Sequence, residues 1–383
     1  MKRRLVLWSG LGAAAFFLGT GGAWLLSLPP TPAAAAMPLI GREEIDAAIE
    51  ALKPPKRPRP LIAIVGINDA TETTDYLMPT GILRRADVAD VMTLATAPGP
   101  MQLYPALKVQ PDATIADFDA RHPEGADYVI VPAMSRDDDP NVLQWLKSQA
   151  KKGATVIGVC AGAKIVAAAG LLDGKRATTH WYYVEELRDS YPTIQYVRDR
   201  RLAVDEKVAT TTGITASMPA MLTLVEAIAG RGRAEATARD LGVPEWDARH
   251  DSSAFKFTRP FALTAIGNTL AFWNRERLRI DLEPGVDEVS LALVADAWSR
   301  TYRSRAETFA SVRGALETKH GVRIIPDQVR AEQDEARRPT ADLAKPPAPA
   351  LDEALKAISQ RYGEGTADFV ATQLEYSRQG GAP

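Results

Sequence analysis

A single cysteine stands where a strand-like segment turns into a helix-like one. Residues 155–159 are apolar and rich in β-branched side chains, and Cys160 follows them directly. Gly158 and Gly162 flank the cysteine at two residues on either side. A tight strand-to-helix turn with small neighbours lifts its central side chain clear of the sheet, as in a nucleophile elbow. The segment therefore predicts a reactive thiol.

The turn would help such a thiol in two ways. The N-terminus of the helix expected at 161–169 would stabilise the thiolate, and the backbone N–H groups of Ala161 and Gly162 are placed to receive an oxyanion. The alternative is that Cys160 is a small buried apolar residue, as most free cysteines are.

Composition excludes several other classes of function. The chain has 383 residues, with 46 Lys and Arg against 48 Asp and Glu, and this balance argues against nucleic-acid binding. One cysteine excludes an intramolecular disulfide, and four scattered histidines make a structural zinc site improbable. We expect no metal and no cofactor.

The N-terminus has the pattern of an export segment. Lys2, Arg3 and Arg4 precede an apolar run from Leu5 to Leu28, and Ala34 to Ala36 offer a cleavage site. The run is also long enough to remain as a signal anchor, and a buried helix is the alternative to both. We expect residues after Met37 to lie outside the cytoplasm, at the periplasmic or extracytoplasmic side of the inner membrane.

The middle of the chain predicts a doubly wound α/β domain with a mostly parallel sheet. Short apolar runs alternate with helix-like segments from Leu61 to Gly230, which is typical of parallel strands covered on both faces. The strands are expected at 61–65, 88–94, 128–132 and 155–159, and the helices at 79–85, 141–151, 161–169 and 217–230. The expected domains are 1–36 (signal peptide or anchor), 37–60 (helix and Pro-rich linker), 61–230, 231–335, 336–350 (disordered linker) and 351–383 (terminal helix, or a hairpin broken at 363–365).

Residues 277–327 look like a partial repeat of residues 61–112. Both begin with alternating apolar residues, and Pro326-Asp327 corresponds to Pro111-Asp112. In this alignment Gly285 falls opposite Gly66, and coincidence is the alternative. The second copy contains no cysteine, so we expect a C-terminal α/β half-repeat without a catalytic half. Residues 261–272 are apolar enough for a buried helix or strand.

The segment from Gly158 to Trp181 carries a family resemblance. Its sequence, with Gly-Val-Cys-Ala-Gly-Ala at 158–163 and Leu-Leu-Asp-Gly-Lys-Arg-Ala-Thr-Thr-His at 171–180, resembles the ThiJ/PfpI family of the class I glutamine-amidotransferase-like superfamily. The branch is that of isonitrile hydratases and the ligand domains of AraC-type regulators. The resemblance covers 61–230 and implies a flavodoxin-like sandwich and a homodimer.

The resemblance also implies partners for the thiol. The family places an acid in the first strand-to-helix loop, here 69–79, and its position corresponds to Asp75, with Glu72 as the substitute. The alternative for Asp75 is an acid at a helix N-terminus. His180, twenty residues after Cys160, would exchange protons with the thiol, or would only hold its own turn together.

Two departures limit what the resemblance implies. Where the family has a Gly-Gly pair that supplies oxyanion donors, this chain has Ala133 and Met134, and Met134 would narrow the pocket. Residues 209–215 lack the His-x-Glu pair that a glutaminase needs, so glutaminase activity is excluded.

Two functions remain open from the sequence. In the first, the Cys160 thiolate attacks a small electrophilic substrate and water completes a hydration or hydrolysis. In the second, the pocket senses a ligand or an oxidant without catalysis, and no DNA-binding domain accompanies it. Either function predicts a small-molecule ligand and contact with the membrane if the N-terminal segment is uncleaved.

Overall fold

A computed structural model describes residues 20–32, 36–243, 245–329 and 343–378. Its strands are β1 (Leu61–Gly66), β2 (Thr71–Glu72), β3 (Asp90–Ala95), β4 (Met101–Tyr104), β5 (Lys108–Gln110), β6 (Ala113–Thr114), β7 (Tyr128–Val131), β8 (Thr155–Gly158), β9 (Arg176–Ala177), β10 (Gln195–Tyr196), β11 (Leu202–Asp205), β12 (Val208–Thr211), β13 (Glu276–Asp281), β14 (Ser304–Ala310), β15 (Leu316–Glu317), β16 (Arg323–Ile324) and β17 (Gln328–Val329). Its helices are α2 (Arg42–Ala51), α3 (Thr73–Ala86), α4 (Ile115–Arg121), α5 (Pro140–Lys151), α6 (Gly162–Ala168), η1 (Trp181–Tyr183), α7 (Val184–Ser190), η2 (Ile214–Ala216), α8 (Ser217–Ala229), α9 (Arg231–Leu241), α10 (Arg259–Leu270), η3 (Phe272–Asn274), α11 (Glu288–Ser299), α12 (Pro347–Tyr362) and α13 (Glu364–Leu374).

The central sheet has the strand order β11-β12-β8-β7-β1-β3-β6. All neighbours pair in parallel except β11, which is antiparallel to β12 at one edge. Every residue of β1, β7 and β8 is buried, as expected for strands covered on both faces. The predicted doubly wound α/β fold is confirmed.

Successive residues of the central strands enter two separate cores. Ile62 and Ile64 of β1 pack into a core that includes α3, α8 and α11, whereas Ala63 and Val65 pack into a core with α4, α5 and α6. Both faces of the central sheet are therefore packed, and this packing holds the carboxyl ends of the strands, where Cys160 follows β8, in a fixed position.

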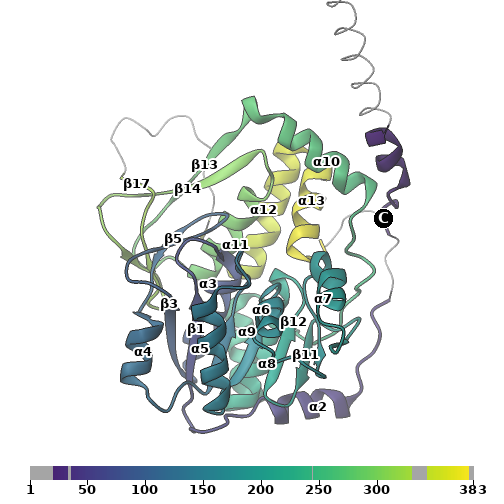
Figure 1. Cartoon of the computed structure of the whole chain (residues 1–383). Coiled ribbons are helices and arrows are strands. Elements are labelled where there is room, and N and C mark those ends of the chain that lie inside the picture. Colours follow the sequence, from purple (N-terminus) through teal and green to yellow (C-terminus); the bar gives the residue numbers. More distant parts are fainter. Residues whose placement is uncertain (1–19, 33–35, 244, 330–342, 379–383) are drawn as a thin grey trace, which may run out of the picture.

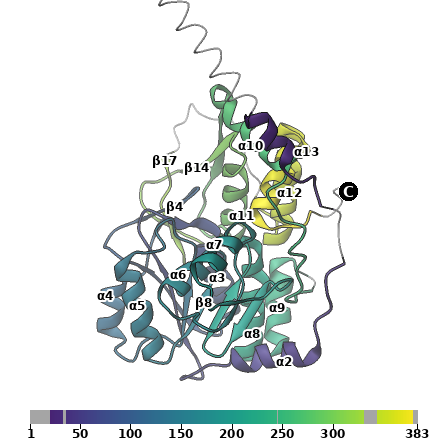
Figure 2. The same cartoon turned by 45° about the vertical axis from the view of Figure 1, so that its right-hand side comes forward.

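The C-terminal region packs at one end of this sheet. Figures 1 and 2 show α10, α12 and α13 beyond one end of the sheet and α2 beyond the opposite end. Strands β13, β14 and β17 form a second, parallel sheet, and β15 and β16 extend a small sheet that contains β5, β4 and β2. The predicted half-repeat is thus a β-α-β unit joined to the first domain.

The first helix of the domain is longer than the sequence predicts. We expected a helix from Pro79 to Arg85, but α3 begins at Thr73, and Pro79 lies inside it. The Glu72 side chain caps its N-terminus by accepting a hydrogen bond from the Asp75 N–H. Burial of most of α3 maintains the helix although Pro79 removes one backbone hydrogen bond.

The apolar segment 261–272 forms a helix, but the prediction that it is buried is only half right. One face of α10 packs on α13, while Leu263, Ile266 and Leu270 are exposed, together with Phe272 and Trp273 just beyond the helix. The sequence pattern misleads here because α10 is apolar on both faces and only one face has a neighbour among the described residues.

Most of the predicted export segment lies outside the described residues, as do residues 336–342 of the linker predicted at 336–350. The end of that linker was predicted wrongly, because α12 already begins at Pro347. Residues 20–27 are helical, and Trp24 packs against Phe257 with ring centroids 6.1 Å apart. Arg259 donates hydrogen bonds to the carbonyls of Leu25 and Leu28. None of the helices within the described ranges has both the length and the apolar character needed to cross a membrane.

The C-terminal helices form a hairpin. α12 begins at Pro347 and ends at Tyr362, and Gly363, with φ of 89°, turns the chain into α13. Proline suits the first position of a helix because its missing N–H needs no partner there. The hairpin places the end of α13 beside the carboxyl ends of β8 and β12.

Candidate active site

Cys160 occupies a strained turn between β8 and α6. Its φ is +57°, a left-handed conformation that non-glycine residues adopt rarely. Two threonines hold the turn. The Cys160 N–H donates to Thr211 Oγ1 at 3.1 Å, and Thr179 Oγ1 donates to the Cys160 carbonyl at 3.0 Å. The side chain is therefore held at the carboxyl end of the sheet.

The two flanking glycines are required by close packing. A Cβ at Gly158 would lie 2.9 Å from the backbone of Ala163. A Cβ at Gly162 would lie 2.9 Å from the carbonyl carbon of Val131 and closer still to its oxygen. Only glycine allows α6 to start this close to β7, so the turn has room for no larger residue at either position.

Asp75 is a buried acid close to the thiol. It lies in the first turn of α3, and its Oδ2 accepts a hydrogen bond from the Ala133 N–H at 3.2 Å. Burial raises its pKa to about 7, although the Ala133 N–H and a side-chain hydrogen bond with Cys160 both favour the charged form. Its Oδ1 has no hydrogen-bond partner of regular geometry within the described residues. Asp75 is thus poised to exchange a proton near neutral pH.

The thiol itself is not stabilised as a thiolate in the resting site. Burial raises the pKa of Cys160 well above its usual value, and the negative charges of Asp75, Glu72 and Glu375 raise it further. The Ala161 N–H at the start of α6 acts in the opposite direction but is outweighed. The resting pair therefore carries its proton on sulfur, and a nucleophilic sulfur requires a base beside it.

Glu72, the substitute acid expected from the sequence, lines the same cavity as Cys160, but both of its carboxylate oxygens are engaged in holding the loop. Its Oε2 accepts from the Asp75 N–H at 2.5 Å, and its Oε1 accepts from Arg300 at 2.6 Å. Arg300 also binds Asp296 at 2.6 Å, and its side chain is 13% exposed. Sequence reasoning missed Arg300 entirely, because no spacing or motif connects it with a loop more than two hundred residues earlier.

His180 has protein partners for both ring nitrogens. Its Nε2 lies 3.0 Å from the Gln373 carbonyl, and its Nδ1 accepts from the Tyr182 N–H at 3.2 Å. Burial lowers its pKa, so the ring is neutral at physiological pH and donates from Nε2. This geometry favours the role of holding the turn and the α13 end together over proton exchange with Cys160.

The predicted oxyanion donors are largely engaged within the protein. The Ala133 N–H binds Asp75, and the Gly162 N–H binds the Val159 carbonyl at 2.7 Å. The Ala161 N–H is directed to the Cys160 sulfur. Met134 is buried and forms a backbone bridge with Thr71, so its chain segment is fixed.

The thiol opens into a cavity of about 730 Å³ between the two parts of the chain. The first domain contributes Cys160, Ala161, Ala133, Met134, His180 and Tyr183, and the C-terminal region contributes Phe261, Arg300, Tyr302, Phe369 and Gln373. Such a volume suits a small organic ligand. Within the described ranges, no three His, Cys, Asp or Glu side chains gather closely enough to hold a metal ion.

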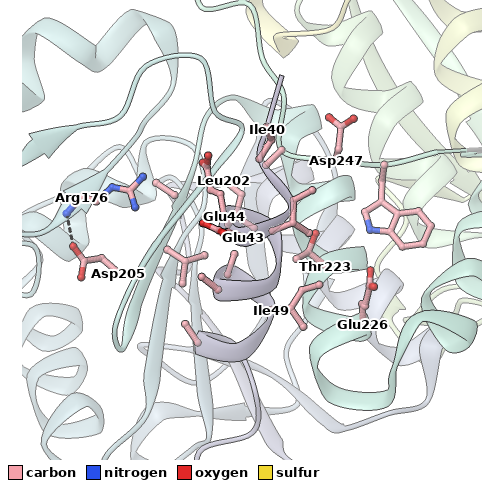
Figure 3. Close-up of a pocket in the computed structure, with 18 of the residues that line it drawn as sticks. Ile40, Glu43, Glu44, Ile49, Arg176, Leu202, Asp205, Thr223, Glu226 and Asp247 are labelled. Atoms are coloured by element: carbon pink, nitrogen blue, oxygen red, sulfur yellow. Dashed lines mark hydrogen bonds between the residues drawn. The ribbon is translucent and has the colours of Figure 1, made fainter. Parts of the chain in front are cut away.

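A second cavity, of about 620 Å³, lies at the other end of the molecule under α2. Figure 3 shows Ile40 and Ile49 facing Leu202 of β11, with Glu43, Glu44 and Glu226 around them. Neither cysteine nor histidine is among its lining residues. The reactive groups that the sequence identified belong to the first cavity.

Comparisons with known proteins identify relatives of the domain that carries Cys160. Residues 62–227 match the DJ-1/PfpI family. Similar proteins include the HTH-type transcriptional regulator CdhR of Pseudomonas aeruginosa, 38% identical over 22% of this chain and 25% of the regulator. An isonitrile hydratase of Pseudomonas putida is 39% identical over 24% of this chain and 40% of that enzyme. The chain thus spans well under half the length of these two relatives.

Matches over longer stretches have lower identity. The Parkinson disease protein 7 homolog of Danio rerio is 26% identical over 44% of this chain and 89% of its own length. The crystal structure of a DJ-1 superfamily protein from Salmonella typhimurium has 21% identity and a TM-score of 0.43, and covers 49% of this chain and all of that one. It is the match of residues 62–227 to the family model that identifies this part of the chain as a DJ-1/PfpI domain.

Proposed function

We propose that this protein is a cysteine enzyme that adds water to a small electrophilic carbon, with Cys160 as nucleophile and Asp75 as the group that moves the proton. The observation that carries the proposal is the burial of Asp75 beside the thiol, with a pKa of about 7 and one carboxylate oxygen fixed by the Ala133 N–H. A base with that pKa is half ionised near neutral pH, where general base catalysis is most effective.

The proposed substrate class is the isonitriles. Sγ of Cys160 attacks the terminal isonitrile carbon as Asp75 takes the thiol proton, and Asp75 then gives that proton to the same carbon. The product is a thioimidate bound to the enzyme. Water adds across its carbon–nitrogen double bond, with the hydroxyl on carbon and one proton on nitrogen. The carbon–sulfur bond then breaks as the hydroxyl oxygen becomes the formyl carbonyl, and the hydroxyl proton restores the protonated Asp75–Cys160 pair. The net reaction converts an isonitrile and water into an N-substituted formamide, with no redox change.

Two features support this substrate class. The Pseudomonas putida relative is named an isonitrile hydratase, and it shares 39% identity over 94 residues. The reaction also makes little demand on an oxyanion hole, because attack on an isonitrile places negative charge on carbon, where Asp75 can deliver a proton. An acyl substrate would need the N–H groups that Ala133 and Gly162 have already committed.

A ligand or redox sensor is the second candidate. The scarcity of free oxyanion donors favours it, since a sensor needs no turnover. The raised pKa of Cys160 favours ligand binding over oxidation of the thiol, because oxidants react with the thiolate. The similar transcriptional regulators would be its counterparts, although this chain offers no recognisable DNA-binding segment.

We place this function at the cell envelope. The basic residues 2–4 and the apolar run from Leu5 to Leu28 support export or anchoring. The end of that run contacts Phe257, just before α10, and Arg259, the first residue of α10. The described end of the apolar run thus lies beside the start of α10, the helix that carries the exposed apolar residues Leu263, Ile266 and Leu270.

A lipid bilayer is the partner that these exposed apolar residues fit. Leu263 is 50% exposed, Leu270 60% and Trp273 76%, and the spacing of 263, 266 and 270 keeps them on one helix face. Helices that lie in a membrane interface present such a face, with tryptophan at the headgroup level. The inner side of α10 lines the Cys160 cavity through Phe261 and Ala265, so the cavity lies next to the proposed membrane surface.

The proposal is tested with the full chain and cyclohexyl isonitrile. We expect N-cyclohexylformamide to accumulate with the wild-type protein and not with Cys160→Ser, and a thioimidate adduct on Cys160 to appear by mass spectrometry. Absence of both formamide and adduct from a folded wild-type protein would refute isonitrile hydration.

A further inference from the structure

The same structural unit occurs once in the first domain and once in the C-terminal region, and equivalent residues are separated by a constant number of positions. Thr93 of β3 and Asp112 form three hydrogen bonds, from the Thr93 N–H and Oγ1 to Asp112 Oδ2 and from the Asp112 N–H to Thr93 Oγ1. Thr308 of β14 and Asp327 form the same three. The second pair follows the first by 215 positions, the difference between 308 and 93.

Backbone conformations repeat at the same spacing. Asp87, the residue after α3, has φ of +50°, and Tyr302, three residues after the end of α11, has φ of +61°. Gly99 and Gly314 have φ of +103° and +112°. The structure thus corrects the register expected from the sequence: Glu72, and not Gly66 or its neighbours, corresponds to the segment around Asp287.

The contacts between the two units are reciprocal. Arg85 of the first unit binds Asp287 of the second. At the spacing of 215, Arg300 is equivalent to Arg85 and Glu72 is equivalent to Asp287. Arg300 of the second unit binds Glu72 of the first at 2.6 Å, so the same ion pair forms in both directions. Thr74 donates to Asp296 at 2.9 Å. The equivalents of Thr74 and Asp296 are Val289 and Gly81, and these two residues are also in contact. A Cβ added to Gly81 would lie 2.5 Å from the Val289 side chain.

The strand contact has the same symmetry. β5 and β16 pair antiparallel, and Val109 lies opposite Ile324, its own equivalent. On one side of this centre Gln110 pairs with Arg323. On the other side their equivalents, Ile325 and Lys108, meet through a hydrogen bond from the Ile325 N–H to the Lys108 carbonyl at 2.7 Å. Reciprocal contacts around a self-paired centre are the signature of the two-fold interface between two identical subunits.

We propose that the C-terminal unit is a built-in second subunit, which occupies the dimerisation face of the first unit and supplies Arg300 as a positioning residue for the Asp75–Cys160 pair. The functional unit is then one chain with one thiol, in place of the homodimer expected from the sequence. The second unit has Ser290 at the position equivalent to Asp75 and has no cysteine. Only the first unit therefore carries an acid–thiol pair, although the contacts between the units are reciprocal.

Arg300 acts on the acid through two routes. It binds Glu72, whose other oxygen accepts the Asp75 N–H and so fixes the first turn of α3. Its positive charge lowers the pKa of Asp75 against the effect of burial. Besides Arg300, the titratable groups that act on the Asp75–Cys160 pair are Glu72 before α3, Asp296 on α11, Glu375 at the end of α13 and Tyr183 before α7.

The two-fold relation supplies a matched control for Arg300. Arg85 makes the equivalent ion pair with Asp287, but it is not among the residues lining the Cys160 cavity. The test compares Arg300→Met with Arg85→Met in the full chain, by the pH dependence of iodoacetamide labelling of Cys160. We expect the inflection near pH 7 to rise by about one pH unit in Arg300→Met and to stay in place in Arg85→Met, since a lost counter-charge shifts a carboxyl pKa by about that amount. Arg300→Lys keeps the positive charge, so its inflection should lie close to that of the wild-type protein.

This part rests on the proposed role of Asp75 and Cys160, and a wild-type profile without an inflection near pH 7 would refute that role separately. Equal shifts in the two methionine variants, or none in either, would overturn the assignment of Arg300. Light scattering tests the subunit proposal independently of the thiol. We expect the protein mass of one chain, 41.4 kDa before any cleavage, and a stable dimer would overturn the proposal.

Discussion

The substitution Gly162→Ala tests how tightly the elbow is built. The new Cβ would lie 2.9 Å from the Val131 carbonyl carbon and closer to its oxygen, and that oxygen cannot turn away because it accepts the Val159 N–H at 2.9 Å. Either α6 moves away from β7 or this buried hydrogen bond breaks. Overpacking costs about 1–3 kcal/mol, and an unsatisfied buried backbone group costs a similar amount.

Since either outcome costs about the same, we expect Gly162→Ala to lower the free energy of unfolding by roughly 1–3 kcal/mol in urea titrations. We also expect slower labelling of Cys160, because Val159 is its neighbour in the chain. Gly232→Ala is the control: a Cβ there has nothing within 4 Å, and alanine in a helix is neutral or stabilising by up to about 1 kcal/mol. A Gly162→Ala protein with wild-type stability and labelling would refute the close-packing argument.

Two other substitutions test the roles assigned to His180 and to α10. His180→Asn keeps an acceptor for the Tyr182 N–H but loses the bond to the Gln373 carbonyl, so we expect about 1–2 kcal/mol less stability in urea and no change in the pH at which Cys160 labelling inflects. A displaced inflection would instead assign His180 to proton exchange with the thiol. For α10, we expect bromine-labelled acyl chains to quench the tryptophan fluorescence of the full chain in vesicles, and Trp273→Phe to remove part of that quenching. The buried Trp145→Phe should leave it unchanged, and equal quenching in all three proteins would contradict membrane contact by Trp273.

The sheet and its elbow were predictable because local sequence determines them. Continuous apolar runs such as 128–131 and 155–158 indicate strands buried on both faces, and the paired glycines around Cys160 indicate the turn. Asp75 was found through the family resemblance alone. Nothing in the local pattern distinguishes it from an ordinary acid at a helix N-terminus, where it also lies.

The features that sequence could not predict all depend on distant packing. The partner of His180 comes from α13, and the partner of Glu72 comes from α11, through a repeat whose identities are too few to fix its register. The exposure of one face of α10 could not be predicted, because an apolar residue is buried only where another element packs against it. The direction of the Cys160 pKa shift also depends on burial and on three carboxylates gathered by the fold.

The most direct test of the central claim is the pH profile of Cys160 alkylation in the full chain, compared between wild type and Asp75→Asn. Asp75 becomes an effective base only as it ionises, so the wild-type rate should rise through an inflection near pH 7 and rise again at much higher pH as the thiol itself ionises. Asparagine matches the shape of aspartate but cannot take a proton, so the first rise should vanish. A wild-type profile with a single inflection at the ordinary cysteine pKa, unchanged by Asp75→Asn, would contradict a proton-sharing pair.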